Sequence, residues 1–378
     1  MAGGNVNKAS YGAARLLAAK LEDHFARHAS ATPSGTQKVG PLPDAEAIEA
    51  LVDAGFWASL QREEGFHPEI SLAYLPPASA ERPLLFGTRL PLGARTLARL
   101  APAVERPGIH LGVWREDGEL VLWGTTRVIP SFCFVLEVIG PGLMVVKHRT
   151  REDSAKFQNV AVFEGEHVKV LSPQALDLSE HPRILESLIA AEAPGSPEDP
   201  VDVLLRLAVS MRAHGRGGTL VVVPADNDGW RGSIVQPIPY AVEPAFTELA
   251  DLTRDGATGG HGALGRGVDA IAGLTAVDGA TLINDRYELI GFGVKIGRPE
   301  GRWRVERVLV SEPIEGGESV AVAPTQLGGT RHISAAQLAQ DQQDAVALVA
   351  SQDGRFTVFA WSQRDQIVHA HRVETLLL

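Results

Sequence analysis

A chain of 378 residues is long enough to form two domains that each bury a hydrophobic core. Its composition, with 44% hydrophobic and 21% charged residues, is typical of a globular protein and excludes a largely disordered one. The formal net charge of -11, from 46 acidic and 35 basic residues, repels polyanions and anionic membrane surfaces. It therefore argues against broad nucleic-acid binding and against a membrane partner.

The sequence also indicates a reducing, cytoplasmic location. Its one cysteine, Cys133, lies in an apolar run typical of a core strand. No window reaches the roughly 18 uninterrupted apolar residues of a membrane span, because the best candidate, 131–146, contains Glu137 and Pro141. The N-terminal residues follow an amphipathic pattern, which differs from that of a signal peptide.

The first expected element is a tethered helix. Apolar residues near helical spacing predict an amphipathic helix over 9–27, followed by a stretch of linker composition, so that 1–44 forms a helix and linker. Such a helix can dock on its own domain or on another copy of the chain. We expect a homo-oligomer.

Residues 45–193 are expected to form a β-rich α+β module. Asp44 is placed to cap a first helix, and short β-type runs follow. Two hairpin turns are expected, at Asp117-Gly118 and at Glu164-Gly165, and a helix over 181–193 ends the module.

A proline-rich stretch, 194–200, predicts the domain boundary, and the pattern after it changes to that of an α/β domain over 200–378. We expect a mixed central sheet flanked by helices. Its parts are a helix ended by Gly215, a buried strand over 217–224, a helix over 242–253, a glycine-rich stretch over 254–267, and hairpins near Asn284 and at Asp353-Gly354.

The stretch GGTRHISAAQ has the composition of an anion-binding loop at the start of a helix. Gly328 and Gly329 let backbone N–H groups approach a ligand, Arg331 suits bidentate contacts to phosphate, and Ser334 is expected to cap a helix through 342. An ordinary polar turn with solvated side chains explains the same residues, and the run matches no Walker pattern.

A second candidate is Asp278, which precedes Gly279 and Ala280 where an apolar strand begins. A carboxylate there could hold Mg²⁺ or Mn²⁺ against phosphates, and the small residues would leave room for a nucleotide. An ordinary Asp-Gly turn between strands is the favoured explanation of these three residues alone.

Together the two candidates resemble the diadenylate cyclase domain of the DNA integrity scanning protein type. That family has ordered signatures: Asp-Gly-Ala, then Gly-Thr-Arg-His-Arg, then a strand ending in Ser-Glu. This chain has DGA at 278–280, GTRH at 329–332 and a strand running to Ser351, and the resemblance covers roughly 200–362. The resemblance implies that two such domains meet face to face. Each would hold one ATP, and the two ATP molecules would condense to cyclic di-AMP.

The resemblance implies a role for each matching residue. Asp278 would bind Mg²⁺ or Mn²⁺ and, in an active enzyme, would be the catalytic residue that helps activate a ribose hydroxyl; His332 would lie near the metal and phosphates. The other residues at the positions of these signatures would bind the nucleotide: Gly279, Ala280, Gly329, Thr330, Arg331, Ser351 and Gln352.

The chain departs from this family at two positions. Ile333 replaces a second arginine that would neutralise triphosphate charge, and Gln352 replaces a glutamate that would help hold a divalent metal. Both changes weaken metal–triphosphate chemistry more than recognition of the nucleoside. Arg266, in a stretch over 261–267 that is expected to be flexible, could supply the missing positive charge, so an active cyclase stays an alternative.

The N-terminal module resembles a probable sensor module called DACNV, which accompanies divergent cyclase-like domains in bacteria; PGLMVVKHR and KFQNVAVFEGEHVKVL carry this resemblance. We therefore predict a nucleotide-binding sensor or signalling protein whose C-terminal domain binds ATP or a cyclic dinucleotide with reduced or no catalysis. The alternatives are an active diadenylate cyclase and a structural interaction protein with a vestigial pocket.

Two further patterns are less informative. The glycines over 291–297 have the wrong spacing for a dinucleotide-binding fingerprint and are interpreted as packing positions in the returning strand of a hairpin. His369 and His371 share one face of a strand and could bind a metal. A solvated strand end is the favoured interpretation, because no third ligand is apparent.

Overall fold

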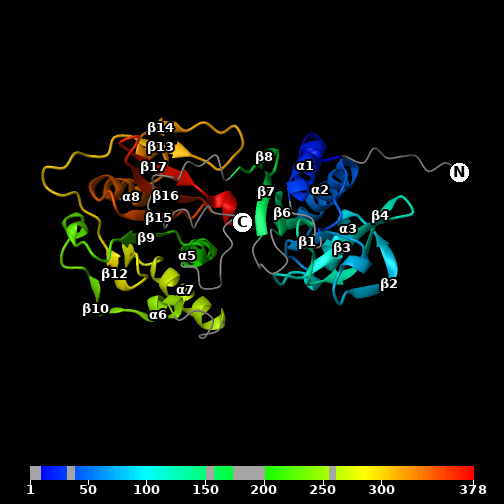
Figure 1. Ribbon diagram of the computed structural model, residues 1–378, viewed down its shortest axis with the longest axis horizontal. Coiled ribbons are helices and arrows are strands. Elements are labelled where there is room, and N and C mark those ends of the chain that lie inside the picture. Colours follow the sequence, from blue (N-terminus) through cyan, green and yellow to red (C-terminus); the bar gives the residue numbers. More distant parts are fainter. Residues whose placement is uncertain (1–9, 32–38, 150–156, 173–200, 255–260) are drawn as a thin grey trace. The chain divides into compact units, whose positions relative to one another are not determined.

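The computed structural model describes residues 10–31, 39–149, 157–172, 201–254 and 261–378. The chain divides into two compact units, Met1–Leu171 with Leu378, and Ser172–Leu377. Each unit is a mixed α/β fold built on one large mixed sheet (Figure 1). The helix predicted over 181–193 and the boundary predicted at 194–200 lie outside the described residues.

The described helices of the N-terminal unit are α1 (Gly12–Ala31), α2 (Ala45–Ser59) and α3 (Ala94–Leu100), with short 3₁₀ helices η1 (Pro77–Ser79) and η2 (Ala101–Ala103). The predicted N-terminal helix is confirmed as α1, and it packs against α2 of its own unit with Leu21 and Phe25 buried. Asp44 caps α2 as predicted, because its side chain accepts a hydrogen bond from the Ala47 N–H at 2.8 Å.

Eight strands form the sheet of this unit: β1 (Ile70–Tyr74), β2 (Leu84–Pro91), β3 (His110–Glu116), β4 (Glu119–Thr126), β5 (Phe134–Gly140), β6 (Leu143–Arg149), β7 (Phe157–Glu164) and β8 (His167–Val170). Their order is β2-β4-β3-β1-β5-β6-β7-β8. Both predicted hairpins are confirmed, with Asp117 and Gly118 at positive φ angles of 49° and 84° between β3 and β4, and Gly165 between β7 and β8. Cys133 is buried, as expected of a core residue.

The described helices of the C-terminal unit are α5 (Val201–Ala213), α6 (Glu248–Arg254), α7 (His261–Leu274) and α8 (Thr330–Asp341), with 3₁₀ helices η4 (Gly229–Ser233), η6 (Pro324–Gln326) and η7 (Glu374–Leu376). Its sheet has the order β10-β12-β11-β9-β15-β16-β17-β13-β14. The strands are β9 (Gly218–Val223), β10 (Tyr240–Phe246), β11 (Ala280–Asn284), β12 (Leu289–Val294), β13 (Val308–Ser311), β14 (Val320–Val322), β15 (Val346–Ala350), β16 (Phe356–Ser362) and β17 (Ile367–Arg372).

Strand β9 is covered on both faces, as its unbroken apolar run predicts. Leu220 and Val222 lie in one core with residues of α5 and α7, whereas Val221 and Val223 lie in another core with residues of α8. Because successive side chains of a strand point to opposite faces, β9 separates the two cores. Figure 1 shows α5, α6 and α7 grouped together and apart from α8. The predicted mixed sheet flanked by helices is thereby confirmed.

Two predictions about this unit are wrong. The helix expected over 242–253 begins as the edge strand β10, and only the part from Glu248 is helical. Pro244 lacks an N–H group, which an edge strand tolerates. The stretch over 261–267 is part of α7 and not a flexible loop, since α7 is held by Val268 and Ile271 in the core it shares with α5. Arg266 is therefore a helical residue.

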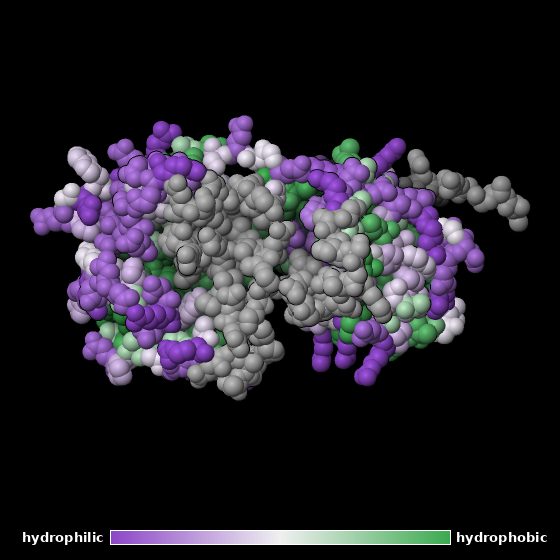
Figure 2. Space-filling model, viewed as in Figure 1, coloured by the Kyte–Doolittle hydropathy of each residue, from purple (hydrophilic) through white to green (hydrophobic). Residues whose placement is uncertain are grey.

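Hydrophilic residues predominate on the face shown in Figure 2, with hydrophobic residues scattered among them. In the part of the chain that the structure describes, none of the helices has the length and apolarity to cross a bilayer.

Candidate functional site

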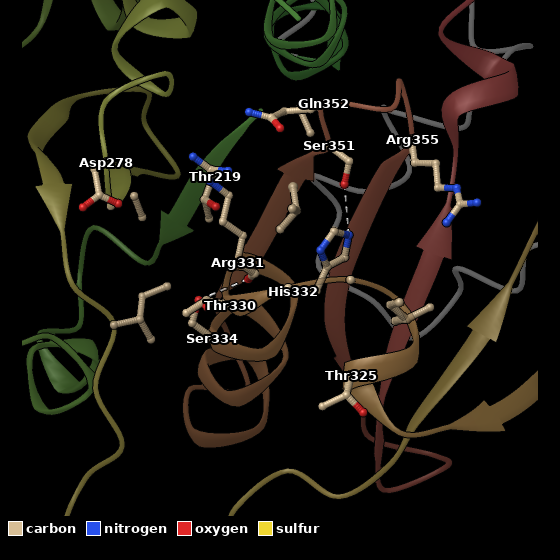
Figure 3. A pocket seen from close by; sticks show the side chains of 18 of the residues that line it. Thr219, Asp278, Thr325, Thr330, Arg331, His332, Ser334, Ser351, Gln352 and Arg355 are labelled. Atoms are coloured by element: carbon tan, nitrogen blue, oxygen red, sulfur yellow. Dashed lines mark hydrogen bonds between the residues drawn. The ribbon is translucent and has the colours of Figure 1, made fainter. Parts of the chain in front are cut away.

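A cavity of about 750 Å³ opens in the C-terminal unit where segments far apart in the sequence meet. It lies at the amino ends of β9 and β11, the carboxyl end of β15 and the first turn of α8 (Figure 3). This volume is within the range of small-molecule sites. All the predicted site residues line it: Asp278, Gly279, Ala280, Gly329, Thr330, Arg331, His332, Ser351 and Gln352.

The segment GGTRHISAAQ forms the start of α8, but its cap differs from the prediction. Gly329 is the N-cap residue, in an extended conformation with φ -80° and ψ -155°, and no side chain of the described residues caps this end. Ser334 lies inside the helix, where its hydroxyl donates to the Arg331 carbonyl oxygen at 3.1 Å, so the prediction that Ser334 caps α8 is wrong. The positive end of the helix dipole therefore faces the cavity through Gly329 and Thr330.

The Asp278-Gly279 turn requires a glycine at its second position. Gly279 has a φ of 108°, and a Cβ there would lie 2.4 Å from the carbonyl carbon of Gly293 on the neighbouring strand. Gly293 in turn has a φ of 67°, and its Cβ would lie 2.7 Å from the Tyr240 ring. Close backbone packing thus fixes the turn that presents Asp278 to the cavity.

Asp278 is ionised and already has a cationic partner. Its carboxylate accepts a hydrogen bond from Lys295 Nζ at 2.6 Å. That hydrogen bond and the charge of Lys295, with a smaller effect from Arg331, lower the pKa of Asp278 below its ordinary value. A divalent metal at Asp278 would therefore compete with Lys295. Within the described ranges, no group of three or more His, Cys, Asp or Glu residues could hold a metal ion.

Arg331 points from the first turn of α8 toward Thr219 at the start of β9 (Figure 3). Gly217 leaves room for its guanidinium, since a Cβ at Gly217 would lie 3.2 Å from Arg331 Nη1. Gln352 lies beside the same glycine and donates to the Arg216 carbonyl oxygen at 3.4 Å. The Arg331 guanidinium thus lies in the cavity against the backbone of Gly217.

His332 is more deeply placed than Arg331, with only 4% of its surface exposed. Its Nε2 lies 3.5 Å from Ser351 Oγ, and a Cβ on Gly328 would come within 2.4 Å of its Nδ1. Burial, the largest effect, lowers the pKa of His332, and the nearby Arg355 and Arg331 lower it further against an opposing effect of Asp353. His332 therefore acts as a neutral hydrogen-bonding group at pH 7.

Sequence reasoning missed several cavity residues, among them Thr219, Lys295 and Arg355. Thr219 is 2% exposed, and its buried hydroxyl has no hydrogen-bond partner among the described residues. Lys295 lies in the glycine-containing run over 291–297, whose glycines do pack closely as predicted. The hairpin could have revealed it, because the pairing of Ala280 with Val294 brings Lys295 beside the Asp278 turn.

His369 and His371 are not solvated, and that interpretation is wrong. They are 6% and 1% exposed because their strand, β17, lies between β16 and β13. His369 Nε2 lies 2.9 Å from Asp365 Oδ2, and His371 Nδ1 lies 2.7 Å from Ser311 Oγ. Both rings thus belong to the internal hydrogen-bonding of the sheet.

Comparison with known proteins bears mainly on the N-terminal unit. Residues 37–127 match the family described as probable sensor domain DACNV, which confirms the expected sensor module over that segment. No curated protein matches the chain. A structure described as the hypothetical membrane spanning protein from Bacillus cereus aligns with 50% of this chain and 71% of that one, at 16% identity and a TM-score of 0.27. That score is too low to show a shared fold.

Proposed function

We propose that the chain is a sensor whose C-terminal unit binds an adenine nucleotide or a cyclic dinucleotide. One observation carries the proposal: three segments, 278–280, 329–332 and 351–352, were assigned to one nucleotide site by their sequence, and all three line one cavity. The sensor character rests on the match of residues 37–127.

The lining suits a phosphate group. Its charged residues are the basic Lys295, Arg331 and Arg355 and the acidic Asp278 and Asp353, which leaves one positive charge in excess. An anion at the start of α8 would meet the helix dipole and the Arg331 guanidinium together, and charge-assisted hydrogen bonds are about twice as strong as neutral ones.

The lining also suits the nucleoside. Gly279 and Ala280 have little or no side chain, so a sugar or base can approach the backbone closely. Thr219 offers a buried hydroxyl that lacks a partner among the described residues, and a buried polar group of this kind is stabilised when a ligand pairs with it.

The charges around Asp278, the proposed metal ligand, favour binding of a nucleotide over its conversion to a product. Lys295 holds the Asp278 carboxylate at 2.6 Å, so a Mg²⁺ or Mn²⁺ ion would have to displace it. Ile333 and Gln352 lack the charges that the cyclase family has at these positions. Metal binding by Asp278 and His332 and catalysis by Asp278 stay predictions. Assembly with a second copy and a relationship to the cyclases are predictions as well.

The test is calorimetric titration of the full chain with ATP and with cyclic di-AMP, each with and without Mn²⁺, together with chromatography of the products. Binding of either nucleotide without product supports the proposal. Formation of cyclic di-AMP that is lost in Asp278→Ala would establish the active cyclase instead. A chain with neither binding nor product would be a structural protein with a vestigial pocket.

A further inference from the structure

A second cavity, of about 490 Å³, lies in the N-terminal unit. Every residue that lines it falls between Glu46 and Leu120, within the segment that matches the sensor family. We propose that this cavity binds a small organic cation, an ammonium or guanidinium compound with an apolar body. This inference is independent of nucleotide binding in the C-terminal unit.

One wall of the cavity is a single face of α2. Glu46, Ala50, Asp53 and Trp57 line it at intervals of three or four residues, the spacing that places side chains on one side of a helix. The other side of α2 is buried in the core of the unit. Ala50 leaves a hollow between the two carboxylates and the indole.

The facing wall consists of the β3–β4 hairpin and the turn before α3. The Leu92 N–H donates to the Leu120 carbonyl oxygen at 3.0 Å, which joins the two segments. Gly118, at a φ of 84°, turns the hairpin directly before Glu119. Gly93 adds no side chain, so the space between the walls stays open.

The charges of the lining select a cation. Its ionisable groups are the carboxylates of Glu46, Asp53 and Glu119 and the guanidinium of Arg115, a net charge of two negative units. Arg115 is already paired, since it donates to Glu46 Oε2 and to Asp44 Oδ1 at 3.1 Å each. An anion would therefore meet uncompensated negative charge.

Two of these carboxylates remain available to a ligand. Asp53 accepts one hydrogen bond through Oδ1, from the Tyr11 N–H at 2.7 Å. For the Glu119 carboxylate, no hydrogen bond or ion pair is found within the described ranges. Asp53 and Glu119 stand on opposite walls of the cavity, so an ammonium or guanidinium group between the walls meets negative charge on both sides.

The rest of the lining favours an organic cation over a metal ion. Trp57, 36% exposed, offers an aromatic face, and Leu92 and Leu120 add apolar surface. A cation over an indole ring gains about 0.5–1 kcal/mol at an exposed site, and apolar surface stabilises the body of the ligand. A metal ion is disfavoured, because this part of the chain has no group of three or more His, Cys, Asp or Glu residues among the described ones that could hold it.

The test uses calorimetry on the full chain with three cationic probes, putrescine, agmatine and phenethylamine, and with the neutral counterparts 1,4-butanediol and phenethyl alcohol. We expect at least one cation to bind at least about tenfold more tightly than its neutral counterpart. Glu119→Gln should weaken that binding about threefold, Asp53→Asn with Glu119→Gln about tenfold, and Trp57→Leu about threefold.

Glu105→Gln is the matched control, because Glu105 is an exposed carboxylate of the same unit outside the cavity. It should leave binding unchanged, as should Arg331→Gln in the other unit. The proposal is overturned if none of the three cations binds at about 10 mM, far above ordinary ligand affinities. It is equally overturned if neutral probes bind as tightly, if Glu105→Gln weakens binding as much as Glu119→Gln, or if only a lysine-rich peptide binds.

Discussion

The two cavities differ in charge and in how they are built. The cavity of the C-terminal unit carries an excess of basic side chains and is formed by sharply constrained turns and the start of α8. The cavity of the N-terminal unit carries an excess of carboxylates and is formed by small residues on a helix face and a hairpin. A site of the first kind leaves short motifs in the sequence, whereas a site of the second kind leaves none.

The largest expected effect concerns this difference in backbone constraint. Gly279→Ala would place a Cβ 2.4 Å from the Gly293 backbone at a φ of 108°. Strain of this kind costs about 1–3 kcal/mol and overpacking a similar amount, so we expect the C-terminal unit to lose about 3 kcal/mol of stability.

The control is Gly93→Ala in the other cavity, where a Cβ would have nothing within 4 Å. Chemical denaturation should show a loss below about 1 kcal/mol for this variant, the scale of a changed helix cap. Equal losses in the two variants would show that the cavities do not differ in constraint.

A second prediction concerns acid sensitivity of the N-terminal unit. Burial, the largest effect, and the charge of His28 lower the pKa of His148 to about 4 from its usual value of 6.5, against an opposing hydrogen bond that the Arg149 carbonyl oxygen accepts. Between these pH values the unfolded chain binds more protons than the folded one. The stability present above pH 6.5 is therefore lost as the pH falls toward 4, by up to about 3 kcal/mol.

His148→Leu should flatten this dependence. The measurement is hydrogen exchange of peptides from β5 and β6 at pH 7 and at pH 5. His24 and His110, whose pKa values burial lowers to about 3 and about 4, keep part of the acid sensitivity in the variant. An unchanged loss of protection in His148→Leu would contradict the assignment to this residue.

The third prediction tests the charge of the C-terminal cavity. Arg331→Gln removes the guanidinium that faces Thr219, and a hydrogen bond to a charged group is worth about 1.5–3 kcal/mol, so nucleotide affinity should fall about 10- to 100-fold. Arg307→Gln removes an exposed arginine that does not line the cavity and should have no effect. Calorimetry measures the nucleotide affinity of both variants. Equal affinities would rule out phosphate binding at Arg331.

The smallest expected effect is that of Lys295→Gln. The hydrogen bond and charge of Lys295 are the main causes that lower the pKa of Asp278, so the pKa should rise toward its ordinary value in the variant. A pH titration of the Asp278 carboxyl carbon by NMR measures this rise. No change in the titration would show that Lys295 and Asp278 are not paired in solution.

The elements predicted correctly are those whose local sequence pattern agrees with the way they pack in the folded unit. Asp44 caps α2, the Asp117-Gly118 turn joins β3 to β4, and the apolar run of β9 is buried on both faces. Each follows from the chemistry of a few adjacent residues. The predicted site residues of the C-terminal unit, which line its cavity, were selected in the same way, because DGA and GTRH are short local motifs.

The errors arise where packing overrides local propensity. Glycines over 261–267 predict a loop, yet α7 forms because its apolar side packs on α5. His371 looks polar and exposed in the sequence, yet its strand lies inside the sheet. Thr219 belongs to an apolar strand and gave no signal of a site. The N-terminal cavity depends on which residues of α2 face the hairpin, a tertiary property with no local pattern.

Photo-crosslinking shows directly whether the C-terminal cavity binds the nucleotide. The full chain would be irradiated with 8-azido-ATP, digested, and mapped by mass spectrometry, with excess ATP as competitor. We expect competed crosslinks in peptides that contain 278–296 or 325–355, the segments that contribute most of the lining. Crosslinks confined to 46–120, or no competed crosslink at all, would contradict nucleotide binding in this cavity.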